Sequence, residues 1–83
     1  MKVKYFAWMK RTVGVAEEEV NPPTEVRTVG DLVAWLRQRS DRHAEALAEG
    51  AAFGAAVDQR TATFDASLTG AREVAFFPPF TGG

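Results

Sequence analysis

A single amphipathic helix pattern lies between strand patterns at both ends of the chain, and this arrangement constrains the fold more than any other feature. Four apolar residues at spacings i, i+3, i+4 and i+7 form one stripe along the helix: Val29, Leu32, Val33 and Leu36. Thr28 can cap its N-terminus, and Asp31 lies where the helix dipole favours a negative charge. A second, shorter helix is expected, with Ser40 or Asp41 as its cap and Gly50 closing it. Because such a stripe must be buried against another element, we expect the flanking strands to form its partner.

Strand patterns precede and follow these helices. The first strand is expected over residues 2–9, where alternation places aromatic groups on both faces, with Phe6 and Trp8 on the outer one. The other expected strands cover residues 15–20, 55–57, 61–64 and 73–77. This order predicts an α+β fold, a mixed sheet of four to five strands with helices on one face. It resembles a β-grasp domain, in which the first and last strands lie side by side in the middle of the sheet.

Length and composition exclude several classes of function. The chain has 83 residues, enough for one domain, and its ten basic and eleven acidic side chains give a net charge of −1, which argues against a nucleic-acid partner. It has no apolar run near the ~20 residues of a membrane span and no N-terminal signal-peptide pattern, so we expect a cytoplasmic protein without a membrane partner. With no cysteine and one histidine, His43, we expect no disulfide, metal site or bound cofactor. The usual catalytic side-chain sets are also missing, so we expect no independent enzyme activity.

Other polar residues have simple structural interpretations. Glu17, Glu18 and Glu19 are expected to form a solvated strand or loop face, although an acidic edge could steer a basic partner. His43, at the start of a polar helix, is interpreted as a solvated or capping residue rather than a ligand. Neither group is assigned a chemical role from the sequence.

The C-terminal segment is the most informative for function. Pro78 and Pro79 follow the last strand, where they stop the sheet ladder and hold the backbone extended. We therefore divide the chain into a domain over residues 1–77 and an extended tail over residues 78–83. The tail ends in Gly82-Gly83, which by itself is typical of a frayed terminus. Because glycine has no Cβ, the same pair could also thread into a narrow channel of a partner.

Apolar residues at the base of the tail favour the second interpretation. If the terminal strands pair, Phe6 and Trp8 share the outer sheet face with Ala75 and Phe77, and an outer patch of this kind marks a partner surface. The group delivered by the tail is then the α-carboxylate of Gly83. A partner that uses ATP could adenylate this carboxylate, and a sulfur donor could convert the acyl adenylate to a thiocarboxylate. The reactive atom would belong to the main chain, which explains the lack of catalytic side chains.

The sequence resembles the ubiquitin-like sulfur carriers that form the small subunit of molybdopterin synthase. The segment from Glu73 to Gly83, Glu-Val-Ala-Phe-Phe-Pro-Pro-Phe-Thr-Gly-Gly, matches the family's closing strand and tail. Lys2 to Ala7, Ser40-Asp41-Arg42 and residues 55–59 support the match, which extends over nearly the whole chain. Departures include Asp58, where the family usually has Asn, and Lys10, where Arg is common.

The resemblance implies a function and a set of partners. A thiocarboxylate on Gly83 would supply sulfur to the large subunit of molybdopterin synthase, which forms the dithiolene of molybdopterin in molybdenum cofactor biosynthesis. A ubiquitin-activating-like adenylyltransferase would charge the tail with ATP, and a cysteine desulfurase or rhodanese-type donor would provide the sulfur. Residues expected to enter the partner are Phe80, Thr81, Gly82 and Gly83; those expected at the interface are Phe6, Trp8, Lys10, Ala75, Phe77, Pro78 and Pro79.

Two alternatives remain at the level of the sequence. The same fold could carry sulfur for thiamine or tRNA thiolation, or serve as a protein modifier, although the Phe-Phe-Pro-Pro segment argues against these functions. The chain could also be an interaction domain whose Gly-Gly end is incidental. The partner that accepts the tail, and the effect of deleting Gly82 and Gly83, distinguish these possibilities.

Overall fold

The two ends of the described chain form the middle of the sheet. The computed structural model describes residues 1–79, and in it β1 (Lys2–Tyr5) runs parallel to β5 (Glu73–Phe77). Tyr5 pairs with Phe76 in this register, so the carboxyl ends of both strands reach the same edge of the sheet. This confirms that the first and last strands are neighbours.

The remaining strands extend the sheet on both sides by antiparallel pairing. β2 (Glu17–Glu19) lies beside β1, while β3 (Gly54–Val57) lies beside β5 and is followed by β4 (Arg60–Ala62). The strand order within residues 1–79 is β2-β1-β5-β3-β4. The mixed sheet predicted from the sequence is therefore confirmed.

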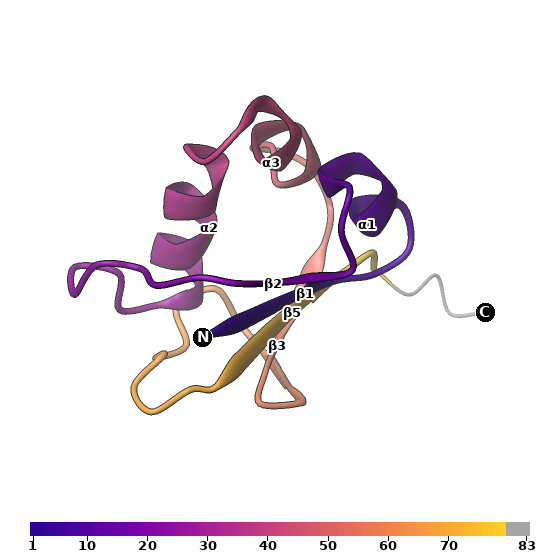
Figure 1. Ribbon diagram of the computed structural model, residues 1–83. Helices are drawn as coiled ribbons and strands as arrows, with labels where there is room; N and C mark the ends of the chain where they lie inside the picture. Colours follow the sequence, from indigo (N-terminus) through magenta and orange to yellow (C-terminus); the bar gives the residue numbers. More distant parts are fainter. Residues whose placement is uncertain (80–83) are drawn as a thin grey trace.

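Three helices in the described residues cover one face of this sheet (Figure 1). α2 (Val29–Arg37) begins at a capping box, in which the Asp31 N–H donates to Thr28 Oγ1 at 3.1 Å and the Thr28 N–H donates to Asp31 Oδ2 at 3.2 Å. α3 (Asp41–Ala46) has Ser40 as its N-cap. Its last helical residue is Ala46 rather than Gly50, because the C-cap residue Leu47 leaves the helical conformation, with φ −111° and ψ 26°.

One apolar core fills the space between the helices and the sheet. The predicted α2 stripe is buried there with side chains from both central strands, which include Val3, Tyr5, Val74 and Phe76. The rings of Tyr5 and Phe76 stack with centroids 6.2 Å apart. Full burial of such a side chain stabilises a fold by about 1.5–3 kcal/mol, so this layer holds the terminal strands together.

The strand expected over residues 2–9 is too long. β1 stops at Tyr5, and residues Trp8–Val13 form a short helix, α1, that the alternation pattern did not predict. Ala7 has φ 54° and ψ −131°, which turns the chain out of the sheet, and the Met9 N–H closes this turn on the Phe6 carbonyl at 3.1 Å. Met9 and Val13, four residues apart, then face the core. A helical spacing was thus present in the sequence but shorter than the strand pattern that overlapped it.

Candidate functional site

The candidate site lies where the chain leaves β5, at Phe77, Pro78 and Pro79, and these residues are called the exit point below. Phe77 is the last residue of the strand, and Pro78 and Pro79 follow it without continuing the ladder. Phe77 and Pro78 are partly buried, while Pro79 is exposed. The predicted inserted residues Phe80, Thr81, Gly82 and Gly83 lie outside the described residues.

Phe6 lies next to this exit point because β1 and β5 are parallel. Its N–H donates to the Phe76 carbonyl at 3.1 Å, one residue beyond the end of β1, and its side chain is 47% exposed. Alternation along β1 places Tyr5 in the core and Phe6 on the outer side. The structure therefore brings Phe6 and Phe77 to the same edge of the sheet, as the sequence predicted.

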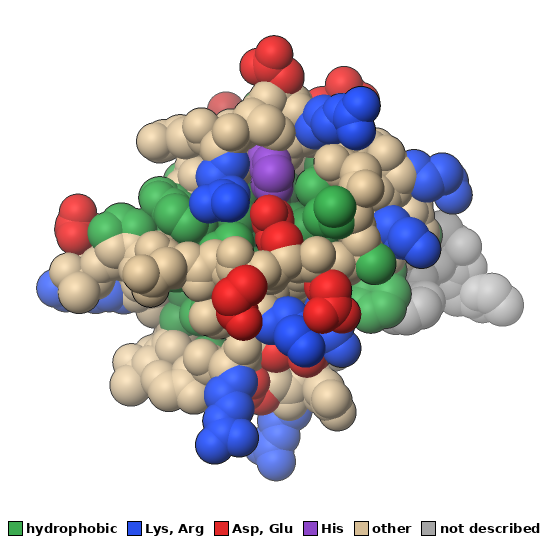
Figure 2. All heavy atoms as spheres, viewed as in Figure 1, with side chains coloured by type: hydrophobic (Ala, Val, Ile, Leu, Met, Phe, Trp, Pro, Cys, Tyr) green, Lys and Arg blue, Asp and Glu red, His purple; other side chains and the backbone are tan. Residues whose placement is uncertain are grey.

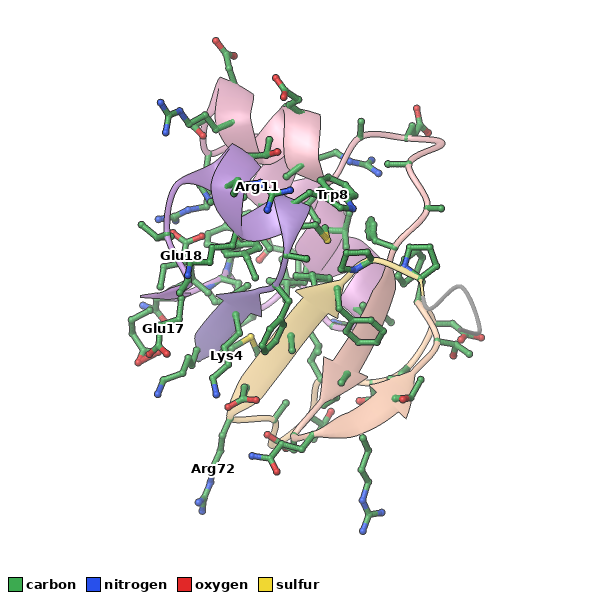
Figure 3. The ribbon with its side chains drawn as sticks, turned by 90° about the vertical axis from the view of Figure 1, so that its right-hand side faces the viewer. Lys4, Trp8, Arg11, Glu17, Glu18 and Arg72 are labelled. Carbon is green, nitrogen blue, oxygen red and sulfur yellow. The ribbon has the colours of Figure 1, made fainter. Side chains whose placement is uncertain are left out.

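Trp8 and Ala75 do not extend this surface as expected. Trp8 belongs to α1, not to a strand, and packs partly buried against the core cluster (Figure 3). Its expected place on the outer sheet face was wrong, because the chain turns at Ala7. Ala75 does face outward between Lys4 and Ala56 but is only 7% exposed, so it offers little contact area.

Lys10 lies on α1 beside the same edge. It is exposed and borders a shallow open depression whose lining also includes Lys4, Phe6 and Glu17. Farther along the outer face, Lys4 Nζ lies 3.3 Å from Glu73 Oε1 and Lys2 Nζ lies 3.3 Å from Glu17 Oε2. Lys4 and Glu17 lie on the side of the sheet away from α1 in Figure 3. The apolar exit point is thus bordered by charged side chains on its sheet side.

A polar cluster on the helix side of β2 was not predicted. Glu18 Oε2 accepts hydrogen bonds from the Tyr5 hydroxyl at 2.6 Å and pairs with His43 Nε2 at 2.7 Å, and Arg39 lies 3.8 Å from Oε1. His43 Nδ1 lies 2.7 Å from Ser40 Oγ. In Figure 2 the histidine, in purple, lies directly above an acidic side chain and next to a basic one.

This cluster corrects two interpretations. Glu18 is not fully solvated, and His43, which is 8% exposed, is not solvated either. The His43 ring instead bonds to Glu18 and to Ser40, the N-cap residue of α3. Burial raises the pKa of Glu18, but the hydrogen bonds from Tyr5 and His43 outweigh it, so the pKa of this carboxyl is lowered overall. Burial and the neighbouring Glu18 raise the pKa of Tyr5 well above its ordinary value. Alternation within Glu17–Glu19 was the available signal, because it turns the middle residue to the opposite face.

The cluster joins β1, β2 and α3. It lies on the helix side of the sheet and its polar atoms bond to one another, so we interpret it as a cluster that stabilises the fold. No three histidine or acidic side chains of the described chain gather as metal ligands would. None of the helices within residues 1–79 combines the length and the apolar character that a membrane crossing requires. The exit point remains as the candidate site: there the exposed Phe6 lies beside Phe77 and the two prolines.

Comparisons with known proteins agree with this geometry. Residues 3–83 match the model of the ThiS family. The chain is 43% identical over 83 residues to the molybdopterin synthase sulfur carrier subunit of Escherichia coli (strain K12), covering 100% of this chain and 99% of the relative.

Solved structures give the same assignment of fold. A putative molybdopterin converting factor, subunit 1, from Pyrococcus furiosus superposes with a TM-score of 0.70 at 31% identity, covering 95% of each chain. SAMP1 from Haloferax volcanii superposes with a TM-score of 0.73 at 24% identity, over 100% of this chain and 98% of that one, and supports the fold alone. The sheet order with parallel terminal strands in its middle is that of the ubiquitin-like β-grasp fold. The chain belongs to the ThiS family and, within it, is similar along its whole length to a molybdopterin synthase sulfur carrier subunit.

Proposed function

We propose that this chain is the sulfur-carrier subunit of a molybdopterin synthase. In this function the carboxylate of Gly83 is adenylated, converted to a thiocarboxylate, and inserted into the large subunit, where its sulfur is used to form the dithiolene. The observation that carries the proposal is the full-length similarity, at 43% identity, to a relative named as a molybdopterin synthase sulfur carrier subunit. The proposal requires Gly83 to be the last residue of the mature protein.

The geometry at the end of β5 supports a docking role. Phe6 is about half exposed, Phe77 is partly buried, and both lie where the chain leaves the sheet through Pro78 and Pro79. Partly buried aromatic side chains are common anchors of protein interfaces. We infer that the large subunit binds this edge through Phe6, Phe77, Pro78 and Pro79, with Lys10 at the rim, and receives residues 80–83. Trp8 and Ala75 contribute less, because each is largely covered by the chain itself.

The chemistry needs no side chain of this protein. A carboxylate oxygen of Gly83 attacks the α-phosphorus of ATP in the activating partner, and pyrophosphate leaves. The terminal sulfur of a cysteine-derived persulfide then attacks the acyl carbon, and AMP leaves. A thiol reductant cleaves the resulting disulfide and frees the thiocarboxylate. The ubiquitin-activating-like adenylyltransferase, the sulfur donor and the cytoplasmic location are parts of the proposal, as is the view that this subunit binds no cofactor and is not an enzyme by itself.

Intact mass spectrometry tests the proposal directly. The chain is co-expressed with its adenylyltransferase and a sulfur donor, and we expect a gain of about 16 Da, because sulfur replaces one terminal oxygen. A variant that lacks Gly82 and Gly83 is the matched control and should show no gain. If the mature wild-type chain extends beyond Gly83, or if its mass is unchanged while the partners are active, the proposal is wrong.

Partner identity separates this function from other sulfur carriers. Affinity purification should recover the large subunit of molybdopterin synthase, and the thiocarboxylated chain should support conversion of cyclic pyranopterin monophosphate to molybdopterin in its presence. Recovery of a thiazole-forming or tRNA-thiolating partner, with no molybdopterin formed, would instead assign the chain to one of those pathways.

A further inference from the structure

The side chain of Phe77 occupies the space in which residue 54 would carry its own. Gly54 of β3 pairs directly with Phe77 of β5, so that side chains at these two positions share one face of the sheet. A Cβ atom placed on Gly54 would lie 2.6 Å from Cε1 and 3.0 Å from Cζ of the Phe77 ring. Non-bonded carbon atoms prefer a separation of about 3.5–4.0 Å, so an alanine at residue 54 and the observed ring position exclude each other.

The backbone itself does not require glycine at this position. Gly14, Gly50 and Gly70 have positive φ angles, but Gly54 does not. Glycine inside a strand packs poorly and often marks a place where another group approaches closely. Here the approaching group is the ring of the last residue in β5. The close approach therefore accounts for a glycine that the local conformation leaves unexplained.

We propose that Gly54 is a positioning residue for docking of the large subunit: its missing side chain seats the Phe77 ring at the base of the tail. With the ring held against β3, the aromatic anchor and the chain that leaves through Pro78 keep a fixed relation before the partner binds. Such preorganisation lowers the cost of ordering an anchor on binding. The identity of the docking partner rests on the proposed function, whereas the seat itself rests on geometry alone.

The substitution Gly54→Ala separates positioning from stability. The new methyl group meets one side of the ring, from Cδ1 to Cζ, and Phe77 is partly exposed, so we expect the ring to swing away without opening the core. Alanine also loses less conformational freedom than glycine when a strand forms. We therefore expect a melting temperature close to that of the wild type, with the ring displaced from β3.

Nuclear Overhauser contacts report the seat in the free protein. In the wild-type chain we expect contacts between the ring protons of Phe77 and the Hα protons of Gly54. In Gly54→Ala we expect the ring to lose its contacts with the backbone of residue 54 while contacts within the core are retained. Absence of the contacts in the wild type, or a ring that keeps its place in the variant, would overturn the proposal.

A double-mutant cycle tests the effect on docking. We expect Gly54→Ala to weaken binding to the purified large subunit about tenfold, the size typical of disturbing an aromatic anchor. In a Phe77→Ala background the same substitution has no ring to displace, so we expect no further loss. Equal weakening in both backgrounds would show a backbone effect, and no weakening in either would show that the seat is not used; both contradict the proposal. A wild-type chain that fails to bind the large subunit would instead contradict the proposed function.

Discussion

At the scale of single residues, Glu18 is the side chain whose surroundings differ most from those the sequence indicates. It lies between two exposed glutamates, yet its carboxylate accepts a hydrogen bond from the Tyr5 hydroxyl and pairs with His43. These contacts join β1, β2 and α3 across 13 and 25 residues of sequence. Hydrogen bonds to a charged group are stronger than those between neutral groups, so the ionised form of Glu18 stabilises the folded chain.

We expect Glu18→Gln to destabilise the fold and to change its pH dependence. The amide keeps an acceptor for Tyr5 but loses the charge, which should cost about 1 kcal/mol at pH 7 after allowance for solvent screening. Because the folded pKa of Glu18 lies below its ordinary value of 4.5, its contribution is complete above that value and disappears as the pH falls through the folded pKa. The difference in unfolding free energy between wild type and variant should therefore shrink in acid. Urea titrations at several pH values between neutral and acidic measure it.

Glu17→Gln is the matched control on the same strand. Glu17 faces the other side of the sheet and forms an exposed ion pair with Lys2. We expect it to change stability by less than about 0.5 kcal/mol, with no comparable loss of the effect in acid. Similar losses in both variants would mean that the Glu18 contacts do not differ in strength from a surface ion pair.

At the scale of elements, the sequence predicted the two helices that periodicity and capping residues determine, and it missed the helix that depends on a turn. α2 begins at Thr28 as expected and closes its capping box, and Ser40 caps α3. α1 was missed because the alternation of residues 2–9 ignores the backbone at Ala7. A positive φ at a residue other than glycine or asparagine leaves no signal in hydrophobic patterning. The Phe6 and Phe77 surface was predicted because pairing of the terminal strands determines it, whereas the place of Trp8 depends on the turn.

We expect Ala7→Gly to stabilise the protein. Ala7 has φ 54° and ψ −131°, the conformation of the first central residue of a type II′ turn, where glycine is preferred. Its methyl group is exposed, so little packing is lost, and relief of the strain should raise the free energy of unfolding by about 1 kcal/mol. Ala16 is exposed as well but has no positive φ, so Ala16→Gly should lower stability instead. Thermal unfolding of the pair checks the difference in sign; destabilisation by both would show that Ala7 is not strained.

At the scale of the whole molecule, the proposed function assigns stability to the domain over residues 1–77 and sulfur transfer to the tail over residues 78–83. The core cluster of the described chain extends from Val3 to Phe76, so we expect its stability not to depend on the last glycines. Parallel pairing of β1 with β5 brings the end of β5 and Phe6 to one edge of the sheet. In the proposed function, a partner holds the domain by this edge while it acts on the carboxylate of Gly83.

Deletion of Gly82 and Gly83 should consequently separate binding from sulfur transfer. We expect the shortened chain to lose less than about 1 kcal/mol of unfolding free energy, because no residue of the described core cluster is removed. A loss of about 1 kcal/mol shifts the melting temperature of a domain of this size by about 4–8 °C, so the melting temperature should stay within a few degrees of that of the wild type. Binding to the large subunit should remain within about tenfold, since the aromatic anchors are kept. Formation of molybdopterin should fall to background, and excess shortened chain should inhibit the wild-type carrier by occupying its partner. Calorimetry, a binding titration and a molybdopterin assay with both chains measure these effects.

Two outcomes would contradict this prediction. A large loss of melting temperature together with the loss of activity would give the glycines a structural role, and activity without them would place the reactive group elsewhere in the chain.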